Sequence, residues 1–153
     1  MSLEHVIRID ENRKDFLDLL LLADEQEDMI DRYLERGQMF ALEDDESVCA
    51  VCVVTDEGAG VLEIKNLAVR PDKQKRGYGR KMIDFVADRF LKNYHTLMVG
   101  TGDSPLTIPF YERCGFTRSH VIKDFFLDHY DHPIIEEGVL LRDMVYLKRS
   151  LSD

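Results

Sequence analysis

The chain has 153 residues, a length that suits one domain with a sizeable apolar core, so we expect a single domain over residues 1–153. Its 30 acidic side chains against 20 basic ones disfavour binding to nucleic-acid phosphates and weakly favour cationic partners. An odd number of cysteines, three, argues against a disulfide framework. With no signal-like start and no apolar run of about 18 residues, we expect a cytoplasmic protein without a membrane partner.

The first third of the chain predicts one strand and two helices. Residues 6–9 form a short apolar strand, after which Asn12 is placed to cap a helix that runs to Leu22. Residues 25–36 repeat apolar side chains at helical spacing, and Gly37 is suited to end that helix in a left-handed conformation. These apolar faces are expected to pack in the core.

A hairpin follows, with strands over residues 38–42 and 47–55 joined by an acidic turn. The second strand contains Cys49 and Cys52, a spacing seen in redox and metal sites. Residues three apart on a strand point to opposite faces of the sheet, so the two sulfur atoms are not expected to share an ion. Core packing is the favoured role.

The strand predicted over residues 61–69 changes the phase of its apolar alternation. Leu62 and Ile64 share one phase, whereas Leu67 and Val69 share the other. A β-bulge produces such a slip, and a central strand buried on both faces is an equally weighted alternative. A bulge would leave a backbone N–H near Asn66 or Leu67 free to bind a ligand carbonyl.

The next stretch, residues 69–80, has the features of an anion cradle. Gly77 and Gly79 let the backbone take positive φ and turn several N–H groups toward one point, where a helix begins and adds partial positive charge. The stretch lacks the Gly-Lys-Ser/Thr of a P-loop and the third glycine of a dinucleotide fingerprint. The basic side chains around the turn are Lys73, Lys75, Arg76 and Arg80.

The remaining elements alternate between helices and strands, which indicates a mixed α/β sheet. We expect a helix with Ser104 as its cap and Pro105 at its first position, made irregular by Pro109, and we expect Cys114 beyond it to be structural. The other predicted elements are an amphipathic helix from Met82 to about Asn93, strands over 96–99, 116–122 and 141–148, and a long connection over 124–138.

Two segments of this sequence resemble the signatures of one family. Gln74-Lys75-Arg76-Gly77-Tyr78-Gly79 resembles the acyl-CoA pyrophosphate loop of the GNAT superfamily of N-acetyltransferases, and Phe110-Tyr111-Glu112-Arg113-Cys114-Gly115-Phe116 resembles its Tyr-x-x-x-Gly-Phe signature. The resemblance implies a GNAT-like fold, in which helices flank a central mixed, mostly antiparallel sheet. It also implies acetyl-CoA as the acyl donor and transfer to a primary amine of a small molecule or peptide.

Carried over residue by residue, the resemblance implies roles for particular side chains. Tyr111 matches the acid that protonates the leaving thiolate, and Glu63 is the favoured base, directly or through a water relay. Asp103 stands where related enzymes often hold a pantetheine-binding Asn. The other implied cofactor contacts are Leu67, Ala68, Val69, Gln74, Lys75, Arg76, Gly77, Tyr78, Gly79 and Arg80.

Other functions stay open at this point. A non-catalytic sensor that binds acyl-CoA is the main alternative, and a nucleotide-binding protein with the same basic turn is a third. The cluster Asp128-His129-Tyr130-Asp131-His132 lacks the spacing of a metal site, so no metal is expected. Its connection is better suited to shape the acceptor site or to form a subunit contact, which leaves a homodimer open.

Overall fold

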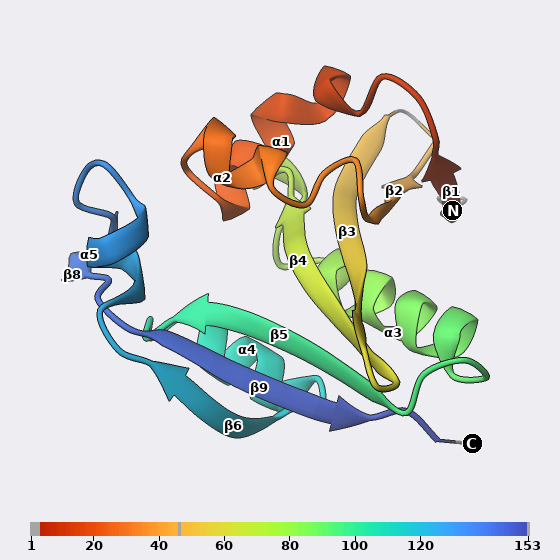
Figure 1. Cartoon of the computed structure of the whole chain (residues 1–153). Coiled ribbons are helices and arrows are strands. Elements are labelled where there is room, and N and C mark those ends of the chain that lie inside the picture. The colour runs from red at the N-terminus through yellow and green to blue at the C-terminus, as the bar shows by residue number, and fades with distance from the viewer. Residues whose placement is uncertain (1–3, 46, 153) are drawn as a thin grey trace.

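The computed structural model describes residues 4–45 and 47–152, whose main feature is a seven-stranded sheet (Figure 1). The strand order is β1-β2-β3-β4-β5-β9-β6, and β4 and β5 form its parallel pair while the other neighbouring strands are antiparallel. The expected mixed, mostly antiparallel sheet is therefore confirmed. Among these residues no helix is long and apolar enough to cross a membrane.

The described elements follow the predicted order with shifted bounds. The strands are β1 (His5–Ile9), β2 (Gln38–Glu43), β3 (Val48–Gly58), β4 (Val61–Val69), β5 (Thr96–Gly102), β6 (Thr117–Ile122), β7 (Ile135–Glu136), β8 (Val139–Leu140) and β9 (Met144–Ser150). The helices are η1 (Arg13–Phe16), α1 (Leu17–Ala23), α2 (Glu27–Asp31), η2 (Pro71–Lys73), α3 (Tyr78–Phe90), α4 (Thr107–Arg113) and α5 (Phe125–His129).

Two apolar clusters lie on the two faces of the sheet. On one face α3 and α4 pack against β3, β4 and β5, and the apolar stripe predicted for α3 is buried. On the other face α1 and α2 pack against alternate residues of β2 and β3. Because burial of apolar area is the main favourable term in folding, this two-layer cover holds the sheet between its helices.

The N-terminal helices are shorter than the sequence predicts, and buried Arg13 is the reason. Its guanidinium donates to the carbonyl oxygens of Ile9 at 3.1 Å and Gly37 at 2.9 Å, and also to that of Leu34. A helix continuing over residues 25–36 is replaced after Asp31 by turns that present these carbonyls to Arg13. The caps proposed at Asn12 and Gly37 are wrong, since Asn12 makes no side-chain cap bond and Gly37 has no positive φ.

The cysteine pair in β3 is core, but the predicted opposite orientation is wrong. Cys49 and Cys52 both belong to the cluster beneath α3. The pairing of β2 with β3 shifts so that Leu42 faces Ala50 and Glu43 faces Val48, which leaves Cys49 as the extra residue of a bulge. That bulge changes the phase of the alternation, so both cysteine side chains lie on the α3 face of the sheet. Burial raises the pKa of the Cys52 thiol to about 12.

The segment around α4 also differs from the prediction. Ser104 does not cap the helix, although its hydroxyl accepts a bond from the Leu106 N–H at 3.1 Å. Pro109 is the third residue of α4, in the first turn, where a backbone N–H has no helical acceptor to lose. The expected irregularity is therefore absorbed by a later helix start.

The connection over residues 124–138, expected as a loop, contains α5 and the strand β7. Together with β8 they stand at one end of the sheet (Figure 1). Phe126, Ile134 and Leu141 form a small buried cluster beneath them. The connection is tied to the α1–α2 loop by the Asp131 N–H, which donates to the Gln26 side chain at 3.1 Å.

Candidate active site

The site begins where the two parallel strands separate. The pairing of β4 with β5 runs only from Val61 and Thr96 to Ile64 and Val99. Beyond that point β4 pairs with β3 and β5 pairs with β9, so the two strands diverge (Figure 1). A cavity of about 350 Å³ opens between them. Its walls come from β4, β5, the α1–α2 loop, α4 and the 124–141 segment.

The predicted bulge lies in β4, at the mouth of this opening. Asn66 pairs with Val53 and Ile64 pairs with Val54, which leaves Lys65 as the extra residue. Of the two explanations weighed for the phase change in this strand, a β-bulge and a strand buried on both faces, the structure confirms the bulge. Residues 65–69 of β4 line the cavity along an edge where β5 no longer pairs, so an extended ligand can bond there as an added strand.

The turn before α3 combines two left-handed residues. Lys75 has φ of 65° and Gly77 has φ of 86°, and Gly77 immediately precedes the first helical residue. A turn of this kind can direct successive N–H groups toward a common point, and we call it the nest. Gly79 serves another purpose than predicted, because its φ is not positive and a Cβ atom there would lie 3.0 Å from Phe110.

The basic side chains near the turn divide into available and engaged ones. Lys75 and Arg76 are exposed, and within residues 4–45 and 47–152 neither forms an ion pair. Arg80 is exposed and donates to the Arg113 carbonyl at 3.1 Å. Lys73 is buried and its ammonium lies 2.9 Å from the Asp44 carboxylate, so its proposed place at the anion cradle is not the one found.

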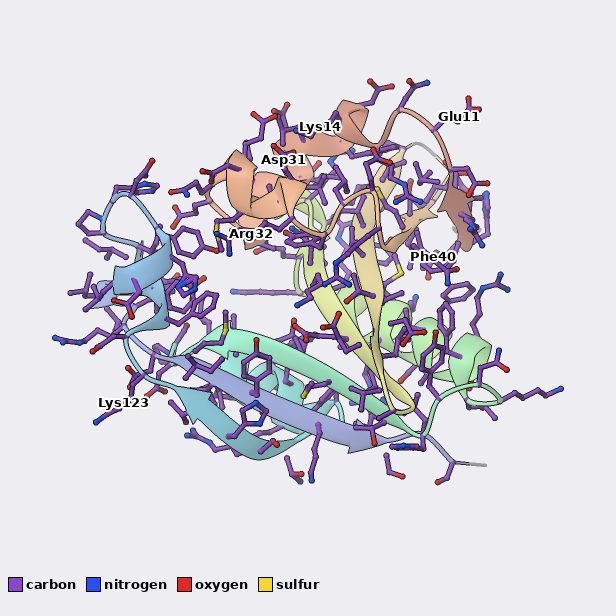
Figure 2. The ribbon with its side chains drawn as sticks, in the orientation of Figure 1. Glu11, Lys14, Asp31, Arg32, Phe40 and Lys123 are labelled. Carbon is purple, nitrogen blue, oxygen red and sulfur yellow. The ribbon has the colours of Figure 1, made fainter. Side chains whose placement is uncertain are left out.

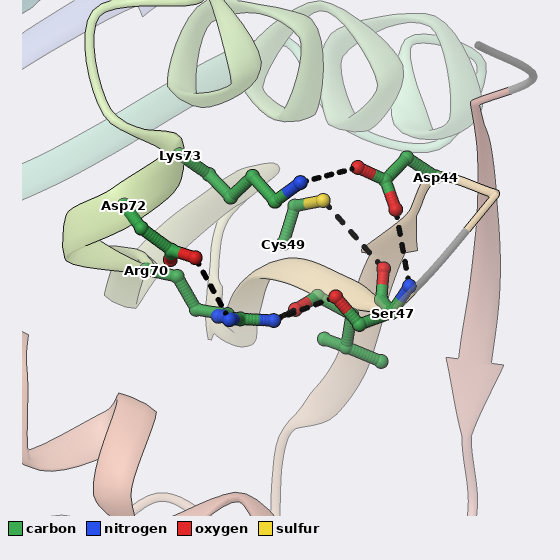
Figure 3. Close-up of polar contacts among 7 residues, drawn as sticks. Asp44, Ser47, Cys49, Arg70, Asp72 and Lys73 are labelled. Carbon is green, nitrogen blue, oxygen red and sulfur yellow. Dashed lines mark hydrogen bonds and ion pairs between the residues drawn. The ribbon is translucent and has the colours of Figure 1, made fainter.

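Figure 3 shows how Lys73 anchors the turn instead. Lys73 reaches Asp44 at 2.9 Å, and neighbouring Arg70 donates to the Ser47 hydroxyl at 2.6 Å and to Asp72 at 3.0 Å. These contacts join the segment before α3 to the β2–β3 connection. They hold the backbone that leads into the nest.

Tyr111 lines the cavity from α4. Its ring makes edge contacts with Phe110 and Phe116, at centroid distances of 5.1 and 5.5 Å. Burial raises the pKa of the Tyr111 hydroxyl above its ordinary value, so the group stays protonated at neutral pH. A protonated hydroxyl at this wall can donate a hydrogen bond or a proton into the cavity.

Glu63 lies beside the cavity rather than in its wall. It is buried on β4, and its carboxylate lies 3.0 Å from the ammonium of Lys65, which does line the cavity. Burial raises the pKa of Glu63 while Lys65 lowers it, and the net change is upward. A role for Glu63 as base would therefore require a relay to the cavity, such as a bound water.

Some of the other predicted cofactor residues line the cavity and some do not. Leu67, Ala68, Val69 and Gln74 line it, and the Gln74 amide donates to the Val69 carbonyl at 3.2 Å. Asp103 does not line it and borders a separate shallow hollow against α4. The lining stops at Gln74 on this side, and the residues from Lys75 to Arg80 form the rest of the turn and the start of α3.

A polar cluster in the cavity wall was missed by the sequence reasoning. Asp24 accepts hydrogen bonds from the hydroxyls of Tyr33 at 3.0 Å and Tyr130 at 2.6 Å. Asn66 donates through its amide nitrogen to the Tyr33 hydroxyl at 3.1 Å and to the Leu20 carbonyl at 3.0 Å. These residues are spread over more than a hundred positions of the chain. The sequence showed that each side chain is polar, but it did not show that they meet.

The histidines and carboxylates in the described parts of the chain do not form a metal-type cluster. No group of three or more His, Cys, Asp or Glu side chains there is arranged to hold an ion. His129 stacks on Phe125 at a centroid distance of 4.3 Å, and His132 lies 2.6 Å from its neighbour Asp131. These contacts account for both histidines of the 128–132 cluster.

Comparison with known proteins now defines the class. A family profile described as an acetyltransferase (GNAT) domain matches residues 35–118. The chain belongs to this family, as its motifs and its splayed sheet indicate. It is 36% identical over 140 residues, 90% of each chain, to YvbK of Bacillus subtilis, described as an uncharacterized N-acetyltransferase.

Solved structures extend the likeness to the whole fold. A GNAT acetyltransferase of Elizabethkingia anophelis with acetyl-CoA bound has a TM-score of 0.91 and 30% identity, covering 97% of this chain and 98% of the other. A Bacillus subtilis acetyltransferase in complex with CoA has a TM-score of 0.88 and 34% identity, covering 97% and 99%. The protein is an acetyl-CoA-dependent N-acetyltransferase, and the sensor alternative is the less supported one.

Proposed function

We propose that the cavity between β4 and β5 is where an acetyl group passes from acetyl-CoA to a primary amine, with Tyr111 as the acid. The observation that supports this proposal is convergence: the bulged edge of β4 and Tyr111 line one cavity, and Gln74, which also lines it, begins the turn that leads through Gly77 into α3. Each supplies one requirement of acyl transfer, namely carbonyl polarisation, thiolate protonation and anion binding.

The nest over residues 74–80 would hold the pyrophosphate of CoA through backbone N–H groups, with Lys75 and Arg76 adding positive charge. The free edge of β4 at Leu67 and Val69 would bond the pantetheine arm, and Gln74 would have to share or release the Val69 carbonyl. Asp103 is left without a direct contact in this arrangement because it lies outside the cavity.

Acetyl-CoA supplies an activated acyl carbon when bound. The nitrogen lone pair of the neutral amine forms the new C–N bond, the C–S bond breaks, and the thiolate takes a proton from Tyr111. The amine loses one proton, which we assign to Glu63 through water beside Lys65, since Glu63 itself lies outside the wall. The products are an amide and a free thiol, and Tyr111 recovers its proton from solvent.

The test is thiol release measured against an amine panel of polyamines, aminoglycosides, amino acids and peptides. Free CoA should appear only with a suitable amine, and Tyr111→Phe should lower kcat about 10- to 100-fold while the Kd for CoA stays unchanged. CoA binding without turnover on the whole panel would support the sensor instead. Displacement of CoA by ATP at equal concentration would point to a nucleotide site.

Two broader properties complete the proposal. Buried free thiols at Cys49, Cys52 and Cys114 suit a reducing compartment, so we place the enzyme in the cytoplasm. The exposed side chains of Leu127 and Ile135, on the 124–138 connection, offer the apolar surface of a homodimer contact. Sedimentation of the purified protein at two concentrations tests the second point.

A further inference from the structure

The polar cluster at the α1–α2 end of the cavity contains one buried oxygen, on the Asn66 side chain, that accepts no hydrogen bond from the described residues. Asn66 is buried, with 3% of its side chain exposed, and lines the cavity. Its amide nitrogen donates to two oxygen atoms, of Leu20 and Tyr33, so a flipped amide would set an oxygen against the Leu20 carbonyl. The orientation is thereby fixed, and the Asn66 oxygen has no partner among the described residues.

Asp24 is the second acceptor of this cluster, and it lacks a counter-charge. Across residues 4–45 and 47–152 no Lys, Arg or His forms an ion pair with it. The hydroxyls of Tyr33 and Tyr130 each donate to one carboxylate oxygen, and the Gln26 backbone N–H also bonds the carboxylate, which leaves part of its acceptor capacity of about four lone pairs. Burial raises the pKa of Asp24, while these three hydrogen bonds lower it.

The surroundings favour a positive ligand. Glu25 and Glu136 also line the cavity, and Lys65, the cation in its wall, is paired with Glu63. Arg32, at the end of α2, is exposed and forms no ion pair with Asp24 in the described chain (Figure 2). The field at this end of the cavity therefore attracts cations.

Both groups contact the same hydroxyl oxygen, that of Tyr33. The Asn66 amide and the Asp24 carboxylate are thus separated by a single hydroxyl group. A primary ammonium carries three N–H donors and no acceptor, which matches two neighbouring acceptor groups. A neutral hydroxyl ligand would satisfy one of them and leave the carboxylate without a counter-charge.

We infer that Asp24 and Asn66 bind a second ammonium group of the acceptor, so that the enzyme selects diamines over monoamines of equal length. The inference rests on the proposed function, because the amine to be acetylated lies at the bulge of β4 while the second ammonium occupies the α1–α2 end. Asn66 belongs to both places, since its backbone is next to Lys65 and its side chain faces Tyr33.

A test that needs no turnover uses the reaction products. N-(5-aminopentyl)acetamide keeps the second ammonium, whereas N-pentylacetamide has the same chain without it. Each is titrated by calorimetry into the wild-type protein with CoA and without it. The ammonium compound should bind about ten- to a hundredfold more tightly, the range expected for a charge-assisted hydrogen bond.

Variants locate the effect. Asp24→Asn should bring the two compounds to affinities within about threefold of each other, and N-pentylacetamide should bind as it does to the wild type. Glu25→Gln removes a neighbouring charge of the same cavity and should keep the preference. Tyr130→Phe keeps the carboxylate and removes one of its donors, so the preference should stay or increase, which provides a second reading if Asp24→Asn is unstable.

Equal affinity of the two compounds for the wild-type protein overturns the inference. So does an equal loss of preference in Asp24→Asn and Glu25→Gln, which would indicate diffuse acidity, or a loss in Tyr130→Phe as large as in Asp24→Asn. Failure of the proposed function is read separately, as absence of thiol release with every amine. If the protein prefers the ammonium compound but releases no thiol with any amine, the subsite at Asp24 and Asn66 is supported and the proposed acetyl transfer is not.

Discussion

Replacing Gly77 with alanine tests whether the turn before α3 binds CoA through its backbone. Gly77 has φ of 86°, and a Cβ atom added there would meet no atom within 4 Å, so the cost is conformational and not steric. Holding an L-residue in the left-handed region costs about 1–2 kcal/mol. Relaxation of the turn would misalign its N–H groups, and losing one charge-assisted bond, about 1.5–3 kcal/mol, should raise the Kd for CoA at least about tenfold.

Gly58 provides a matched control for this experiment. It has the same φ of 86° and equally open surroundings, but it is the last residue of β3 and lies outside the cavity and the turn before α3. Gly58→Ala and Gly77→Ala should lose similar free energies of unfolding in urea. Calorimetry with CoA should separate them, because only Gly77→Ala weakens binding. Equal CoA affinity in the two variants would refute backbone recognition of the pyrophosphate.

Three further predictions concern the base, the packing of α3 and the N-terminal fold. Because burial raises the Glu63 pKa above 4.5, kcat/KM should fall as pH falls through that raised value, and Glu63→Gln should remove this limb; an unchanged profile excludes Glu63. Gly79→Ala, whose added Cβ atom would lie 3.0 Å from Phe110, should destabilise the fold by about 1–3 kcal/mol in urea. Arg13→Met leaves three buried carbonyls unpaired and should cost about 3–5 kcal/mol; a loss under 1 kcal/mol would contradict this.

The sequence predicted those parts of the fold that depend on local pattern. The apolar period of α3, the turn residue Gly77 and the phase slip in β4 each reflect contacts within one element or one strand pair. Helix ends were predicted less well. Residues 32–36 have helical periodicity, yet Arg13, distant in sequence, takes the Leu34 and Gly37 carbonyls and replaces the helix with turns.

The candidate site divides in the same way. Tyr111 and the residues of the nest belong to short motifs with fixed spacing, so they could be named in advance, and their roles remain predictions. Lys73 shared the charge of its neighbours but is buried against Asp44, a residue that lies 29 positions away. Charge is visible in a sequence, whereas the partner of a charge is decided by the fold.

By itself the sequence indicated the class of this protein through the resemblance of two short segments to family signatures. It also predicted the local elements, because glycine positions, apolar periods and strand alternation are set by covalent geometry and burial over a few residues. Only the tertiary structure decided where β4 leaves β5 and which side chains meet there. The hydrogen bond from Tyr130 to Asp24 spans 106 positions, and no local pattern specifies it. It forms because the 124–138 connection and the α1–α2 loop cover the same end of one cavity, where buried polar groups must find partners.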